Sequence, residues 1–215
     1  MKKSHALIIG ATGATGRELV KRLLKDDNYN QVTIFVRTTP NISHKKLKIH
    51  VINFKELQKN KELIKGDILF STLGTTKKDA GGRDQQYEID YAYQYEFAKI
   101  ASENGVGKLS LVSSVGANSA SLFFYPKIKG ALEEAVKKLN FKKIDIFQPP
   151  MLIRQPDLMR AGEKSGIKVL NKLNKIGILK SQKPLAVEIL ADKMLKMAKT
   201  PSNEKATTYL PKNIY

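Results

Sequence analysis

Short apolar runs alternate with amphipathic stretches along the chain as far as Pro149. Each run has the length of a buried strand. The runs are Ala6–Ile9, Val32–Val36, Leu47–Asn53, Asp67–Ser71, Lys108–Ser113 and Ile144–Gln148. Between them, apolar residues recur at the three-to-four spacing of a helix, as Leu19, Val20, Leu23 and Leu24 do. This alternation predicts a parallel sheet that is covered by helices on both faces.

Helices are also expected in the later intervals between the runs. The predicted segments are a short helix around Leu57–Ile64, a long one over Gln85–Asn104 and a third over Pro126–Leu139. After Pro149 and Pro150 the alternation stops, and the rest of the chain is rich in lysine. We therefore expect a single domain over residues 1–215 with a doubly wound α/β fold. Residues 150–185 would form a small cap over the substrate end of the sheet.

The first apolar run leads directly into Gly10-Ala-Thr-Gly13-Ala-Thr-Gly16 and then into a helical pattern. Because glycine has no Cβ, it permits a tight turn, lets a pyrophosphate approach the backbone and brings helix and strand together. The start of the helix offers free N–H groups and a partial positive charge to phosphates. Strand, glycine turn and helix in this order predict a dinucleotide site, with a purely structural turn as the alternative.

The end of the second run bears on which dinucleotide is bound. NAD sites usually carry an acidic residue about 20 residues beyond the glycines, where it binds the ribose 2′-hydroxyl. This chain has Val36-Arg37-Thr38-Thr39 at that place. An arginine forms charge-assisted hydrogen bonds with a phosphate, which an aspartate would repel. We predict NADP(H) rather than NAD(H), with Arg37 and Thr38 on the 2′-phosphate. The alternative is an ordinary solvated arginine.

Two tyrosines have a lysine four residues later, Tyr95 with Lys99 and Tyr125 with Lys129. That spacing puts both side chains on one helix face, where the ammonium favours the phenolate and the tyrosine can shuttle a proton. With eight tyrosines in a lysine-rich chain, one such match is expected by chance. Only Tyr125 follows the fifth run, so we select it together with Lys129.

A serine hydroxyl is expected to polarise the same carbonyl group. Ser113 and Ser114 end the fifth run, and neighbouring strand side chains point to opposite faces. We prefer Ser113, which lies three residues before Gly116, but Ser114 stays open. Pro126 disfavours helical geometry at the residue before it, which predicts that Tyr125 lies at or just before the start of the helix.

Composition limits the other possibilities. The chain has no cysteine and three scattered histidines without ligand spacing, so no metal site is expected. The formal net charge is +18, but the lysines are spread along the chain with few aromatic residues among them, so we expect no nucleic-acid partner. No apolar stretch approaches the length of a membrane span, and the first residues do not resemble a signal peptide. A cytoplasmic location follows from this interpretation.

Four lysines in the final third lie at helical spacing opposite three apolar residues. They are Lys164, Lys168, Lys172 and Lys175, facing Ile167, Leu170 and Leu173. A basic amphipathic helix can bind an anionic membrane surface. More commonly, such a helix packs its apolar face on the protein and exposes the other to solvent, which is the interpretation we favour.

Several motifs together resemble the atypical short-chain dehydrogenase/reductase group that includes the HIV Tat-interacting protein. The resemblance covers most of the chain. It comprises Gly10–Gly16, Val32–Arg37, Val51–Leu57, Leu73–Thr76 with Ala80-Gly81, Leu111–Ala117, Phe123–Gly130 and Phe147-x-Pro149. The sequence departs from the group's pattern at Asn53, where an aspartate is common, and at Pro150, which replaces a glycine.

The resemblance implies a Rossmann-type fold and a set of cofactor contacts. Thr12, Gly13, Ala14 and Thr15 would line the phosphates. Leu73 and Gly74 would border the cofactor, Leu152 would lie near the nicotinamide, and Arg160 would reach back toward the cofactor. Two functions remain: an NADPH-dependent reductase acting on a small carbonyl or alcohol substrate, and a non-catalytic NADP(H)-sensing regulator with a protein partner. The pair Tyr125 and Lys129 favours the enzyme. The substrate and the oligomeric state stay open.

Overall fold

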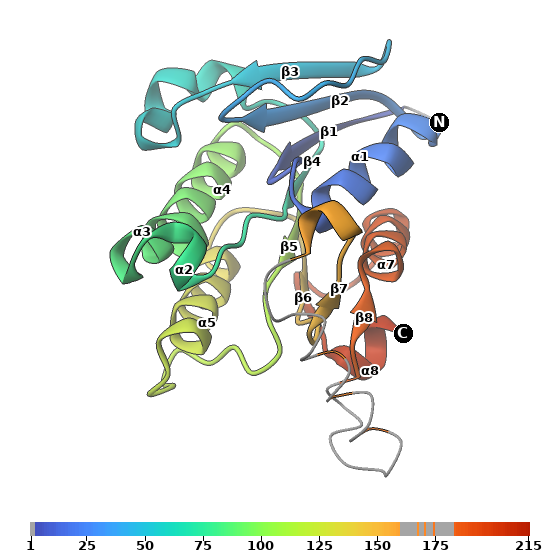
Figure 1. The fold of residues 1–215 in the computed structure, drawn as a ribbon. Coiled ribbons are helices and arrows are strands. Elements are labelled where there is room, and N and C mark those ends of the chain that lie inside the picture. Colours follow the sequence, from blue (N-terminus) through green and yellow to red (C-terminus); the bar gives the residue numbers. More distant parts are fainter. Residues whose placement is uncertain (1–2, 160–166, 168–169, 171–173, 175–182) are drawn as a thin grey trace.

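A parallel sheet forms the centre of the protein in the computed structural model, which describes residues 3–159, 167, 170, 174 and 183–215 (Figure 1). The sheet has seven strands in the order β3-β2-β1-β4-β5-β6-β9. The strands are β1 (Ser4–Ile9), β2 (Tyr29–Val36), β3 (Leu47–Val51), β4 (Ile68–Ser71), β5 (Lys108–Val112), β6 (Lys143–Phe147) and β9 (Ala206–Tyr209). The predicted doubly wound parallel sheet is confirmed. The order changes direction between β1 and β4, and ligands of such sheets bind beyond the carboxyl ends of the strands at this point.

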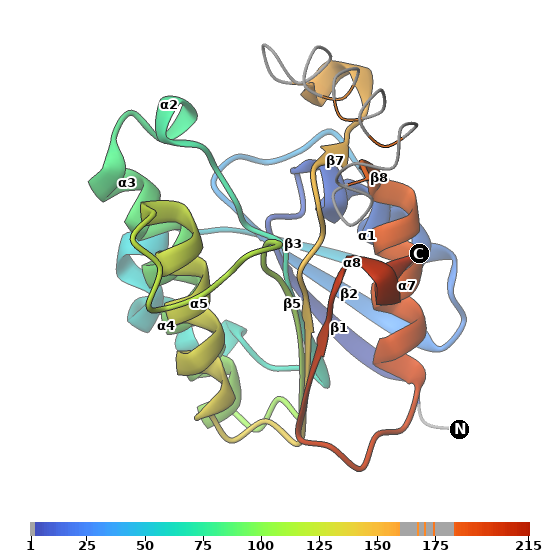
Figure 2. The same cartoon turned by 90° about the horizontal axis from the view of Figure 1, so that it is seen from below.

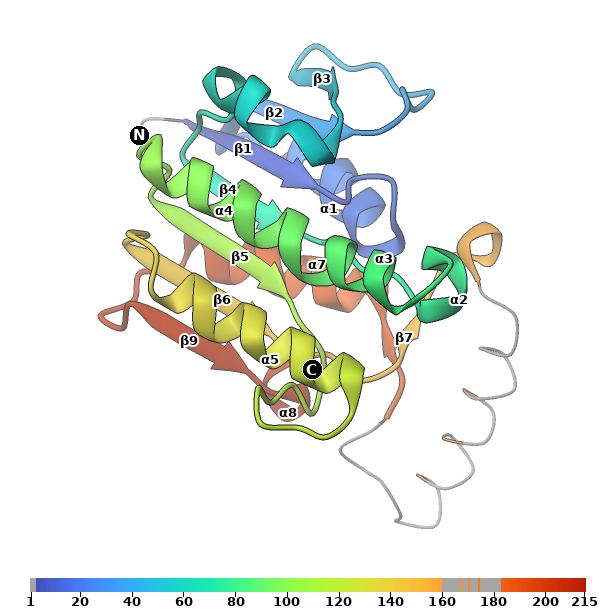
Figure 3. The same ribbon diagram turned by 90° about the vertical axis from the view of Figure 1, so that its left-hand side faces the viewer.

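Helices cover both faces of the sheet, as Figures 2 and 3 show from two directions. α1 (Ala14–Lys25) and α7 (Val187–Lys199) lie side by side on one face, and α4 (Tyr93–Glu103) and α5 (Phe124–Lys137) cover the other. The shorter elements are the 3₁₀ helix η1 (Phe54–Leu63), α2 (Lys77–Ala80), α3 (Arg83–Tyr87), η3 (Pro156–Leu158) and α8 (Pro211–Ile214).

Strand residues alternate between two apolar cores. Ile8, Ile34 and Phe70 pack toward α1 and α7. Their neighbours Leu7 and Leu69 pack toward α4 and α5 in the second core. Because a buried parallel strand is apolar on both sides, its sequence is a continuous apolar run, which is the pattern that identified these strands.

The long helix predicted over Gln85–Asn104 differs in the structure. α3 ends at Tyr87, and a π-helical segment, η2 (Glu88–Ala92), joins it to α4. A π turn inserts an extra residue into the helical repeat, so a pattern with a period of 3.6 does not reveal it. Its effect here is to bury the carboxylate of Asp90 completely.

The helix predicted from Pro126 begins two residues earlier, at Phe124, so Tyr125 lies in its first turn. A proline is tolerated there, because the first helical N–H groups have no partner within the helix.

The expectation that regular alternation stops after Pro150 was wrong. α7 and β9 follow the cap segment, and β9 extends the sheet beside β6. The half-buried sequence of β9, Ala-Thr-Thr-Tyr, has no continuous apolar run and lies at the sheet edge, so periodicity did not reveal it.

The two ends of the predicted cap meet in a short parallel pair. β7 (Leu152–Ile153) pairs with β8 (Leu185–Ala186). Arg160 and the four lysines of the predicted basic helix lie outside the described residues. In the described part of the chain, every helix is too short or too polar to cross a membrane.

Candidate functional site

The glycine turn after β1 is shaped by two close approaches. Gly10 has a φ of +79°, and a Cβ there would lie 2.5 Å from the carbonyl carbon of Thr72. A Cβ on Gly16 would lie 2.1 Å from the carbonyl oxygen of Gly10. Glycine at these positions therefore lets the turn pass against the loop after β4 and lets α1 begin directly above it. Among the described residues, no side chain caps the start of α1, which leaves its first N–H groups available to an anion.

A cavity of about 600 Å³ opens at the carboxyl ends of β1, β4, β5 and β6. We call it the glycine-turn cavity. Its lining includes most of the residues that the sequence selected: Gly13, Ala14, Thr15, Leu73, Gly74, Ser113, Tyr125, Lys129 and Leu152. Gly10, Thr12 and Gly16 belong to the turn but not to this lining. Together, the two glycine approaches, the uncapped helix start and the cavity fit the diphosphate of a dinucleotide.

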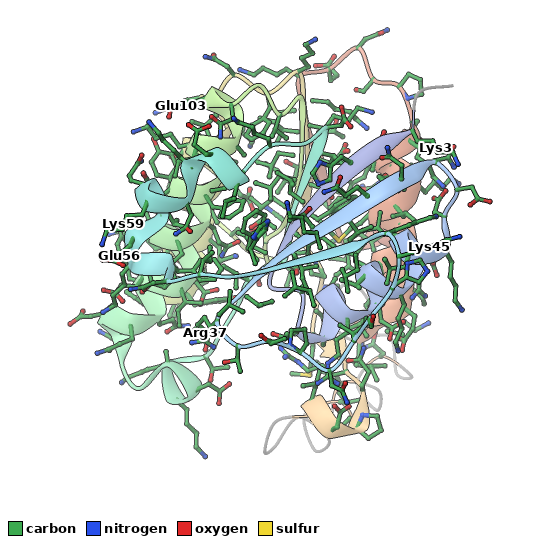
Figure 4. The ribbon with its side chains drawn as sticks, turned by 90° about the horizontal axis from the view of Figure 1, so that it is seen from above. Lys3, Arg37, Lys45, Glu56, Lys59 and Glu103 are labelled. Atoms are coloured by element: carbon green, nitrogen blue, oxygen red, sulfur yellow. The ribbon has the colours of Figure 1, made fainter. Side chains whose placement is uncertain are left out.

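A second cavity, of about 660 Å³, lies beyond the ends of β2 and β3, and we call it the Arg37 cavity. Arg37, Asn53 and Tyr93 are among its lining residues, and Thr38 is exposed beside Arg37. Figure 4 shows Arg37 at the carboxyl end of β2, far from Lys45 at the opposite end of these strands. The position suits the adenosine end of a dinucleotide whose diphosphate lies at the glycine turn.

Lys129 is buried at the base of the glycine-turn cavity. Its Nζ donates a hydrogen bond to the carbonyl of Val112 at 3.2 Å and lies 4.0 Å from Asp90 Oδ1. Burial lowers the pKa of Lys129, while Asp90 and Glu133 act in the opposite direction. Asp90 also accepts a hydrogen bond from the backbone N–H of Thr75, at 3.3 Å. The carboxylate thus links the lysine to the loop that follows β4.

The two serines differ in what their hydroxyls contact. Ser113 is buried and donates a hydrogen bond to Glu133 Oε1. Gln148 donates to both oxygens of the same carboxylate, at 2.9 and 3.1 Å. Ser114 is partly exposed at the cavity wall, where its hydroxyl donates a hydrogen bond of 3.3 Å to the carbonyl of Val115. The hydroxyl of Ser113 is therefore held by a buried carboxylate, while that of Ser114 makes a longer hydrogen bond to a backbone carbonyl at the cavity wall.

Sequence reasoning missed Asp90, Glu133 and Gln148. Glu133 follows Lys129 by four residues, which places the two on one helix face, so this neighbour was open to detection. The sequence pattern did not indicate that Asp90 is buried. A π turn directs its side chain inward, and a pattern with a period of 3.6 does not reveal such a turn.

Comparison with known proteins agrees with this geometry. A family model described as NAD(P)H-binding matches residues 10–144. Protein HTATIP2 of Rattus norvegicus is 31% identical over 167 residues, which are 76% of this chain and 69% of that protein. The chain belongs to the NAD(P)H-binding, atypical short-chain dehydrogenases/reductases. The resemblance derived from the sequence motifs is thereby confirmed.

Fungal proteins are also similar to this chain. Protein FMP52, mitochondrial, of Candida albicans is 36% identical over 68% of this chain and 66% of its own length. Protein FMP52-1, mitochondrial, of Scheffersomyces stipitis is 35% identical over 81% of this chain and 75% of its own length. The chain thus matches about two thirds to three quarters of these relatives. Their names, and those of two further fungal relatives, contradict the expectation of a cytoplasmic protein.

Solved structures share the fold at low sequence identity. The enzyme WbmH of Bordetella bronchiseptica, in complex with NAD⁺, has a TM-score of 0.74 at 14% identity, over 97% of this chain and 76% of its own. UDP-glucose 4-epimerase of Thermotoga maritima has a TM-score of 0.70 at 11% identity, over 96% of this chain and 76% of its own length. These likenesses show the fold.

In this short-chain dehydrogenase/reductase, the segment after β7 is tied to the start of α1. Gln155 Nε2 donates hydrogen bonds to the carbonyl of Ala14 at 3.0 Å and to Glu18 Oε1 at 3.1 Å, and Arg17 forms an ion pair with Asp157. Burial of Glu18 raises its pKa, but hydrogen bonds from Lys21, Gln155 and Arg22 outweigh this and lower it to about 2. These contacts hold the cap segment beside the glycine turn.

Proposed function

We propose that the chain is an NADP(H)-dependent oxidoreductase that acts on a small carbonyl or alcohol substrate. The observation that carries the proposal is that Tyr125 and Lys129 line the same cavity as the glycine turn. When bound, NADP(H) supplies the hydride donor or acceptor. Gly13, Ala14 and Thr15 would hold its phosphates, and Leu73, Gly74 and Leu152 would border it.

Tyr125 is proposed as the group that exchanges a proton with the substrate oxygen. The positive charge of Lys129, four residues later on the same helix face, favours the phenolate form of a tyrosine. Asp90 supports this role because a carboxylate 4.0 Å from Nζ favours the charged form of the lysine against the effect of burial.

A serine hydroxyl is proposed to donate a hydrogen bond to the same substrate oxygen. The sequence favoured Ser113, but each hydroxyl has one hydrogen, and Ser113 directs it to the buried carboxylate of Glu133. Ser114 directs it to the carbonyl of Val115 through a longer hydrogen bond of 3.3 Å, which a substrate oxygen can replace more easily. We therefore assign the polarising hydroxyl to Ser114, and give Ser113 a positioning role in which it links β5 to α5. Both residues line the cavity, which is why the choice stays a prediction.

NADP(H) is proposed over NAD(H) because Arg37 and Thr38 occupy the end of β2, where an acidic residue would favour NAD. The lining of the Arg37 cavity includes a neighbouring cation, Lys55, and one carboxylate, that of Glu88. A guanidinium at this position would bind the 2′-phosphate with charge-assisted hydrogen bonds.

NADPH oxidation in the presence of a panel of aldehydes and ketones tests the proposal, together with calorimetric titration of NADPH. We expect turnover by the wild type and a loss of about 10²–10⁴-fold in kcat for Tyr125→Phe with NADPH affinity retained. Undiminished turnover by Tyr125→Phe contradicts the mechanism. Tight NADPH binding without turnover of any compound favours the second candidate, a non-catalytic NADP(H)-sensing regulator.

A further inference from the structure

The described side chains that line the glycine-turn cavity carry positive charge and no negative charge. Four cations line it, and no aspartate or glutamate of the described residues does. The cations are Lys77, Arg83, Lys129 and Arg154. Lys129 has the buried carboxylate of Asp90 beside it, so its charge is balanced locally. The cavity as a whole favours anionic ligands, because charges of one sign along a cleft reinforce one another.

Arg83 lines the same cavity as Tyr125. Its guanidinium carbon lies 5.6 Å from the ring centre of Phe124, the residue directly before Tyr125 in α5. Among the described residues, the guanidinium has no hydrogen bond and no carboxylate partner. An arginine that rests on an aromatic ring keeps the N–H groups at its edge free, and their planar arrangement suits a carboxylate or a phosphate.

Gln86 lies three residues after Arg83, which places both on one side of the helical segment. It lines the cavity and is 5% exposed. Its backbone N–H bonds to the carbonyl of Gly82, but its side-chain amide makes no hydrogen bond with another described residue. The amide is not among the fully buried side-chain groups without a partner, so it is reached from the cavity and can exchange hydrogen bonds with a polar ligand atom there.

We infer that the substrate carries an anionic group, a carboxylate or a phosphate, which Arg83 and Gln86 bind while its carbonyl or hydroxyl carbon reacts beside Tyr125. The inference rests on the proposed function and adds to it the class of substrate. Phe124 relates the anion site to the reacting group, since its ring contacts the guanidinium of Arg83 and it directly precedes Tyr125 in α5. The only bond changes are those of the proposed reaction, and the anionic group stays intact.

Paired substrates test this inference with the full chain and NADPH. One pair is 4-carboxybenzaldehyde with methyl 4-formylbenzoate, and the other is glyceraldehyde 3-phosphate with glyceraldehyde. The wild type is expected to prefer a charged member by at least about tenfold in kcat/KM, the minimum for one charged hydrogen-bonded contact. The two pairs distinguish a carboxylate from a phosphate.

Arg83→Gln is expected to lower kcat/KM for the preferred charged aldehyde by about 10–100-fold through KM, and to leave its neutral partner within about twofold. Gln86→Met, which removes the amide at similar volume, should act in the same direction with a smaller effect. Lys78→Gln is the matched control, because it removes the same charge from α2, the neighbouring helix, at an exposed residue outside the cavity lining. Lys78→Gln should leave kcat/KM unchanged for both the charged aldehyde and its neutral partner.

Binding measurements separate failure of this inference from failure of the proposed function. Benzoate and benzamide are titrated calorimetrically into the NADP⁺-loaded protein. Tighter binding of benzoate that Arg83→Gln abolishes and Lys78→Gln retains supports an anion site even if no aldehyde is reduced. Equal turnover of the charged and neutral aldehydes in both pairs, or a loss of NADPH affinity in Arg83→Gln without a change in substrate preference, would overturn the inference. Equal affinities of benzoate and benzamide would exclude the carboxylate, so that only a preference for the phosphorylated aldehyde would then support an anion site.

Discussion

Lys129 Nζ lies 4.0 Å from Asp90 Oδ1, and both side chains are almost fully buried. They come from two different helical segments, and the π turn between α3 and α4 brings the carboxylate to the lysine. The pair therefore connects Lys129, which lines the cavity, to the helical segment that leads into α4 and packs against α5. A buried cation that loses its partner is costly, which makes this relationship accessible to measurement.

Asp90→Leu is expected to lower the free energy of unfolding by about 3–5 kcal/mol, because it leaves the Lys129 ammonium buried without this partner. The double variant Asp90→Leu/Lys129→Met should recover part of the loss. Urea denaturation of the two single variants and the double variant gives the coupling energy. Strictly additive effects would show that the two charges do not interact.

The two serines are expected to respond differently to removal of the hydroxyl. Ser114→Ala should lower kcat by about 10²-fold, the size of one lost oxyanion donor, with little effect on stability. Ser113→Ala should instead cost about 1–3 kcal/mol of stability, since the buried Glu133 loses a donor. Steady-state kinetics and thermal denaturation of both variants show which serine hydroxyl acts in catalysis and which one stabilises the fold. A larger kinetic defect in Ser113→Ala would restore Ser113 as the catalytic hydroxyl.

Arg37→Asp is expected to reverse the preference between the two dinucleotides. The affinity for NADPH should fall by about 10–100-fold, the effect of losing a charge-assisted contact, while the affinity for NADH should stay the same or improve. Lys45→Asp is the matched control, because it makes the same charge reversal at the opposite end of these strands (Figure 4). Equal losses in the two variants would indicate a general effect of charge rather than a 2′-phosphate contact.

Glu18 predicts a pH dependence of stability. Its pKa is about 2 in the folded protein and 4.5 ordinarily, so it stabilises the fold above pH 4.5, and the contribution is lost as the pH falls toward 2. At pH 7, Glu18→Gln should cost on the order of 2–3 kcal/mol. The wild type and the variant should converge between pH 4.5 and 2. Glu62→Gln is the control: the hydrogen bond from Lys65 also lowers the pKa of Glu62, but this pair is exposed to solvent, so the wild type and this variant should differ much less at pH 7.

Much of the fold followed from the sequence because buried parallel strands are apolar on both faces. The predicted runs overlap β1, β2, β4, β5 and β6, and their bounds agree to within a few residues. The half-buried edge strand β9 and the π turn η2 were missed for opposite reasons. β9 exposes polar side chains, so its run is broken, and η2 keeps a helical composition while it changes the helical register.

The site could be predicted where the chemistry depends on local spacing. The glycine turn and the pair Tyr125 and Lys129 are motifs within a single turn or helix, and the structure places them on one cavity. Contacts between distant segments, such as Lys129 with Asp90 or Gln148 with Glu133, depend on how the helices and strands pack. The periodicity of the sequence does not predict such contacts, so they were found only in the structure.

The parallel pair β7–β8 closes a loop beside the main sheet. Leu152 lies opposite Leu185, so the pairing of the two short strands brings the ends of the segment between them together. The entropic cost of closing such a loop grows only with the logarithm of its length. Evolution could therefore change the length of the segment between β7 and β8 at a small cost in stability. In this architecture, that part of the chain can vary almost independently of the stability of the sheet.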